Sequence, residues 1–104
     1  MGASTVQTMV DRIVERVHPI RVVLFGSHAR GQATAQSDVD LLVVLSQVGD
    51  KRKAAVEIRR LLADLPVAKD IVVTTPEEIA RRGDLPGTVL RSALRDGTVV
   101  YEQP

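Results

Sequence analysis

Residues 22–45 constrain the fold more than any other stretch of this chain. Two apolar runs of β type flank a polar loop that opens with Gly26-Ser27 and closes with Asp38-Val39-Asp40. A continuous apolar run bounded by turn residues is typical of a strand that is buried on both faces. The stretch therefore predicts two strands with a phosphate-sized turn and a carboxylate pair between them, an arrangement that suggests a nucleotide site.

Helical periodicity, capping residues and short apolar runs predict the remaining elements. We expect helices over 4–17 and 51–64, a short helix from 75 to about 83, another from 84 or 88 to 97, and strands over 20–25, 38–45, 67–74 and 98–101. Glu78, three residues after Thr75, is expected to close a capping box. The strand over 20–25 is expected in the centre of the sheet and the strand over 98–101 at its edge.

The order of these elements predicts a single α/β domain of the α+β type, a sheet covered by helices, over residues 1–104. With 104 residues, the chain is expected to build one core and to have no second lobe for an acceptor substrate. We therefore expect the acceptor to be presented by another chain.

Composition excludes several classes of function. The formal net charge is +1, and Phe25 and Tyr101 are the only aromatic residues, which disfavours direct nucleic-acid binding. The absence of cysteine excludes disulfides, thiol catalysis and cysteine-ligated zinc. No apolar stretch approaches the roughly 20 residues that span a bilayer, and no signal-peptide pattern is present, so a cytoplasmic protein without membrane contact is expected.

Three aspartates are candidates for metal-dependent chemistry. Asp38 and Asp40 are two residues apart on an expected strand, so both side chains should leave the same face, with Cα atoms roughly 7 Å apart. Carboxylates so placed repel each other unless they share a cation, and they can hold one Mg²⁺ or share two ions about 4 Å apart. If the third strand lies beside the second, Asp70 reaches the same ions as third ligand and candidate base for an attacking hydroxyl.

The Gly26-Ser27 turn is the candidate site for phosphate groups. Glycine lets the backbone approach a ligand closely, and a helical turn after it would aim N–H groups and the Ser27 hydroxyl at an anion, with Arg30 adding a fixed charge. The glycine spacing matches neither the Walker pattern nor a dinucleotide fingerprint. Each feature alone has an ordinary structural explanation, and their combination indicates the site. The scattered basic residues of the helices, Arg59 and Arg60 among them, are interpreted mainly as solvated faces.

Residues 22–45 resemble the signature of the nucleotidyltransferases of the DNA polymerase β superfamily. The segments Gly26-Ser27-His28-Ala29-Arg30-Gly31 and Ser37-Asp38-Val39-Asp40-Leu41 are similar to its smallest branch, the MntA-like minimal nucleotidyltransferases. The resemblance covers essentially the whole chain. It implies a mixed sheet with helices packed mainly on one face.

The resemblance also implies residue roles. Gly26, Ser27, Arg30 and Ser37 would bind the triphosphate of ATP. Asp38, Asp40 and Asp70 would hold two Mg²⁺ ions and form the catalytic centre. In the MntA-like branch the protein is the antitoxin of a HEPN-domain ribonuclease toxin and transfers AMP to a tyrosine of that toxin, which implies a hetero-oligomer.

Two alternatives to this enzymatic function remain open. The first is a non-catalytic antitoxin that neutralises its partner by masking it. The second alternative is a nucleotidyltransferase for a small molecule of the aminoglycoside type, which is disfavoured because those relatives need extra helices to bind the acceptor.

Overall fold

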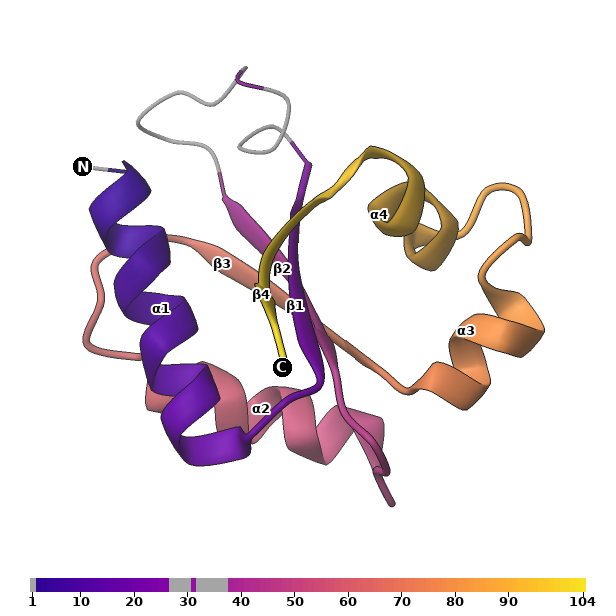
Figure 1. The fold of residues 1–104 in the computed structure, drawn as a ribbon. Helices are drawn as coiled ribbons and strands as arrows, with labels where there is room; N and C mark the ends of the chain where they lie inside the picture. Colours follow the sequence, from indigo (N-terminus) through magenta and orange to yellow (C-terminus); the bar gives the residue numbers. More distant parts are fainter. Residues whose placement is uncertain (1, 27–30, 32–37) are drawn as a thin grey trace.

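The computed structural model describes residues 2–26, 31 and 38–104 (Figure 1). Its elements follow the predicted order: α1 (Gly2–Val17), β1 (Arg21–Phe25), β2 (Val39–Val44), α2 (Lys51–Leu61), β3 (Lys69–Thr74), α3 (Pro76–Arg82), α4 (Val89–Asp96) and β4 (Thr98–Glu102). Most predicted bounds are met within two residues, and α2 ends three residues earlier than expected. In the described part of the chain, no helix is both long and apolar enough to cross a membrane.

The four strands form one mixed sheet in the order β3-β2-β1-β4. Strand β1 runs antiparallel to both of its neighbours, with a register shift against β4 between Val22 and Val23, whereas β2 and β3 are parallel. The parallel pair requires a crossover, which α2 supplies. The predictions of a mixed sheet, a central β1 and an edge strand at β4 are therefore confirmed.

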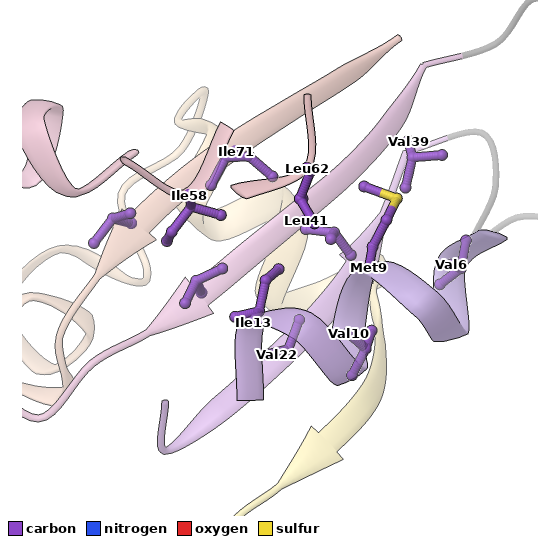
Figure 2. Close-up of a cluster of buried hydrophobic side chains, with 12 residues drawn as sticks. Val6, Met9, Val10, Ile13, Val22, Val39, Leu41, Ile58, Leu62 and Ile71 are labelled. Carbon is purple, nitrogen blue, oxygen red and sulfur yellow. The ribbon is translucent and has the colours of Figure 1, made fainter. Parts of the chain in front are cut away.

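Helices α1 and α2 cover one face of the sheet and enclose the larger of two apolar cores (Figure 2). Alternate residues of each strand point to this face because successive side chains of a strand leave opposite faces. The core combines them with the apolar stripes of both helices: Val6, Met9, Val10, Ile13, Val22, Val39, Leu41, Val43, Ile58, Leu62, Ile71 and Val73.

Helices α3 and α4 lie against the other face, where a smaller core is formed by Val23, Phe25, Leu42, Val44 and Ala93 (Figure 1). The helices are thus divided more evenly between the two faces than expected, although the larger core belongs to the α1/α2 face. The reason is that β1 and β2 are apolar on both sides, so each side requires a cover. The even-numbered positions of β2 and β3, including Asp40 and Asp70, belong to the α3/α4 face.

The starts of α2 and α3 are capped by side chains, with one difference from the expected capping box. The side chains of Asp50 and Thr75 accept hydrogen bonds from the backbone N–H groups of Lys53 and Glu78, at 3.1 and 3.2 Å. The Glu78 carboxylate, however, accepts a hydrogen bond from the buried Thr74 hydroxyl at 2.6 Å and pairs with Lys51. Glu78 therefore links β3, α3 and the start of α2.

Candidate functional site

Asp40 and Asp70 lie side by side on the α3/α4 face of the sheet. They are Cα partners in the parallel pairing of β2 with β3. Neighbouring strands are about 4.8 Å apart, and residues in register project their side chains from the same face. The α2 crossover therefore brings together two carboxylates that are remote in the sequence.

Gly26 follows the last residue of β1 and lies against the Asp40 side chain. Its φ is +75°, a conformation that glycine adopts far more readily than residues with a Cβ atom. A Cβ atom at this position would lie 2.2 Å from Asp40 Oδ2. Glycine therefore serves two purposes here: it turns the chain out of β1 and leaves space for the carboxylate.

Arg59 of α2 joins the Asp70 side chain. Its Nη2 atom donates a hydrogen bond to Asp70 Oδ1 at 3.2 Å, and each side chain is 53% exposed. Arg59 was not expected at the site, because an exposed cation on a basic helix looks like part of a solvated face. Nothing in the local pattern distinguishes Arg59 from Arg60; the contact depends on how α2 packs beside β3.

Of the remaining predicted site residues, the structure describes only Asp38. Asp38 is exposed and directly precedes β2, which begins at Val39. Ser27, Arg30 and Ser37 lie outside the described residues. Within the described ranges, no group of three or more acidic, histidine or cysteine side chains is assembled that could hold a metal ion. The structure therefore brings together Asp40 and Asp70, and it does not gather Asp38 into a three-carboxylate centre with them.

The donor set of this region is suited to a hard divalent cation. Asp40 and Asp70 offer carboxylate oxygens, the ligands that Mg²⁺ prefers, and Mg²⁺ typically needs only one or two protein carboxylates because water and substrate phosphates complete its shell. The adjacent glycine turn allows a phosphate-bearing ligand to approach the backbone closely. The residues present therefore fit a metal-assisted site for a nucleotide.

The fold and this pair of carboxylates define a candidate site for phosphate-group chemistry on a small α+β domain. A model of the nucleotidyltransferase domain family matches residues 6–99, and the chain belongs to this family. Such transferases generally use a nucleoside triphosphate and a divalent metal ion. No curated protein matches the chain in sequence.

Two solved structures share the fold. A protein from Sulfolobus solfataricus assigned as a nucleotidyltransferase is 18% identical with a TM-score of 0.67, covering 96% of this chain and 79% of its own. A toxin–antitoxin structure with AMP-PNP is 21% identical with a TM-score of 0.69, covering 93% of this chain and 73% of its own. At these identities the likeness establishes the architecture, a mixed sheet with four helices.

Proposed function

We propose that this protein transfers AMP from ATP to a hydroxyl group of a partner protein, a tyrosine of a HEPN-domain ribonuclease toxin, and thereby acts as the antitoxin. The observation that carries the chemistry is the register pairing of Asp40 with Asp70 beside Gly26. Membership of the nucleotidyltransferase family supports the reaction class. The structural similarity to a toxin–antitoxin supports the kind of partner.

In the proposed reaction, the acceptor oxygen attacks the α-phosphorus of ATP in line with the leaving group. A bond forms between this oxygen and the phosphorus, the bond to the β-phosphate oxygen breaks, and pyrophosphate leaves. The hydroxyl proton passes to the Asp70 carboxylate and then to water. Most of the rate enhancement comes from holding the two reactants in this geometry.

The residues of the site have distinct proposed roles. Asp40 and Asp70, with Asp38 from the segment before β2, would hold two Mg²⁺ ions, which when bound neutralise phosphate charge and favour ionisation of the acceptor hydroxyl. Gly26 lets the chain approach the triphosphate, and Ser27, Arg30 and Ser37 are proposed to bind its oxygens. The donor site thus spans the β1–β2 connection, while Asp70 lies on the edge strand β3.

The order of strands supports an acceptor supplied by a partner. Across the sheet from β1 to β3, the proposed donor turn follows β1 and Asp40 lies on β2. Asp70, the proposed base, lies on β3. Strand β3 is an edge of the sheet, and Asp70 is half exposed there. A hydroxyl group carried by another chain can therefore reach Asp70 from solvent.

Label transfer from ATP carrying ³²P in its α-phosphate tests the proposal. We expect the purified toxin to be labelled in the presence of this protein and Mg²⁺, and to lose ribonuclease activity in parallel. The Asp40→Asn variant should abolish both effects. Asp84→Asn, which alters an exposed aspartate between α3 and α4, is the matched control and should retain both.

The same experiment separates catalysis from masking. If Asp40→Asn transfers no label yet still neutralises the toxin, the protein acts as a binding module and the proposal is wrong. Labelling of an aminoglycoside without any partner protein would instead assign it to small-molecule modification. Replacement of the acceptor tyrosine of the toxin by phenylalanine should remove the label.

A further inference from the structure

We propose that Arg59 is a positioning residue for Asp70, holding its carboxylate in one orientation on the edge strand. The contact itself is independent of the proposed function, and its effect on catalysis rests on that function. No role for Arg59 follows from the sequence motif, since Arg59 lies on α2, outside the segment 22–45.

The surroundings of Asp70 explain why it needs such a contact. Asp70 is the second residue of β3, an edge strand, and its side chain is 53% exposed. A carboxylate half surrounded by water has little packing to select one rotamer. Among the residues that the structure describes, Arg59 is the side chain that binds it. The bond is made to Oδ1 of the carboxylate.

The backbone of Arg59 is firmly placed. Ile58, which precedes Arg59, is 2% exposed. Leu62, which lies three residues after Arg59, is completely buried in the α1/α2 core. The N–H group of Leu62 also donates a hydrogen bond to the Arg59 carbonyl at 3.1 Å. Because α2 packs beside β3, the base of the Arg59 side chain has a fixed position relative to Asp70.

Charge gives a second reason for the contact. Asp40 and Asp70 are neighbours in register, and two carboxylates at this separation repel each other. Without a counter-charge, the half-exposed Asp70 side chain can relieve the repulsion by turning toward solvent. The guanidinium of Arg59, carried by a helix that covers the opposite face of the sheet, meets the carboxylate at the β3 edge and favours one of its orientations. An exposed ion pair contributes little to the free energy of folding, but the same small free energy favours one rotamer of Asp70 several-fold over the others.

The orientation can be measured directly in the metal-free protein. Three-bond couplings from Asp70 Cγ to its backbone nitrogen and carbonyl carbon report the χ1 rotamer. We expect one dominant rotamer in the wild type and more strongly averaged values in Arg59→Met. Arg60→Met removes the neighbouring exposed arginine and serves as the matched control, with wild-type couplings expected. Unchanged couplings in Arg59→Met, or equal averaging in Arg60→Met, would overturn the proposal.

Transfer kinetics give the functional readout. We expect Arg59→Met to lower kcat by about 10- to 100-fold, the loss typical of a misplaced catalytic group, with KM for ATP within about twofold. Arg59→Lys keeps a cation near Asp70 and should restore part of kcat. The proposal that Arg59 positions Asp70 is contradicted if Arg59→Met changes KM alone, or if Arg59→Lys restores none of the lost kcat. If the wild type transfers no label, the proposed function fails, while the couplings still decide whether Arg59 orients Asp70.

Discussion

Asp40 and Asp70 are register partners on the parallel strands β2 and β3, although a loop, a helix and a turn separate the two strands along the chain. Their side chains leave the same face of the sheet about 4.8 Å apart at the backbone. This relationship is the central geometric fact of the candidate site. It predicts that the two carboxylates act as one unit.

The first prediction concerns this coupling. Asp40→Asn and Asp70→Asn should each lower the rate of label transfer by at least about 100-fold. Because groups that act as a unit are non-additive, the double variant should be no more than a few-fold slower than the slower single variant. Initial rates of transfer from α-labelled ATP provide the measurement. Losses that multiply in the double variant would show that the two carboxylates act independently.

The second prediction concerns the space between Gly26 and Asp40. In Gly26→Ala the added Cβ would meet Asp40 Oδ2 at 2.2 Å, so the carboxylate must move and transfer activity should be lost. Gly87→Ala is the matched control, since Gly87 also has a positive φ, +81°, but no atom within 4 Å of an added Cβ. Both variants should lose about 1–2 kcal/mol of stability from backbone strain.

Label transfer and thermal unfolding, measured on both glycine variants, separate strain from the clash. Gly87→Ala should keep wild-type activity despite its lower stability. Equal loss of activity in the two variants would mean that backbone strain, and not displacement of Asp40, is responsible.

The third prediction concerns acid stability. Hydrogen bonds from Lys51 and then from the Thr74 hydroxyl lower the pKa of Glu78 from its ordinary value of 4.5. A carboxyl group whose pKa is lower in the folded state stabilises the fold above its unfolded pKa, and this contribution is lost as the pH falls through the folded pKa. Glu78→Gln should therefore be less stable than the wild type by roughly 1 kcal/mol at neutral pH, and the difference should shrink below pH 4.5.

Urea unfolding over a series of pH values measures this effect. Glu77→Gln is the control. The Glu77 side chain is 80% exposed, and its ion pair with Arg81 is long, with 3.7 Å between Oε1 and Nη2. Its stability should follow the wild type throughout. A constant difference between Glu78→Gln and the wild type at every pH would show that the carboxylate charge is unimportant.

The fourth prediction concerns the junction of α4 with β1. A Cβ atom on Gly97 would lie 2.3 Å from the Ala93 carbonyl oxygen and 2.5 Å from Val23 Cγ1. Gly97→Ala should thus lower the free energy of unfolding by about 1–3 kcal/mol through overpacking. Gly49→Ala, where an added Cβ meets nothing within 4 Å, should change it far less. Similar values for the two variants in urea unfolding would contradict the close packing of α4 on β1.

Much of the fold was predictable because its signals are local. The continuous apolar runs of the strands and the cap residues Asp50 and Thr75 are recognisable within a few residues of the chain. These interactions determine where elements begin and end. The order of all eight elements was therefore predicted correctly, and only bounds and the distribution of helices over the two faces needed revision.

The site was predictable only in part. Asp40 and Gly26 were selected from the motif in residues 22–45, and Asp70 from its place at the start of the expected third strand. The adjacency of β2 and β3 that joins the two carboxylates was stated as a condition. Outside the site, the prediction that Glu78 closes a capping box was wrong, because its carboxylate binds Thr74 and Lys51 instead. Arg59 was not selected at all.

The amino-acid sequence by itself determined the elements, their caps and the glycine turn beside the acidic segment, since these depend on local backbone preferences and on the period of the apolar pattern. Only the tertiary structure decided that β3 pairs in parallel with β2, that Asp70 lies beside Asp40, and that Arg59 binds Asp70. These contacts join segments that are distant along the chain, and their geometry is set by how α2 packs its buried residues against the sheet.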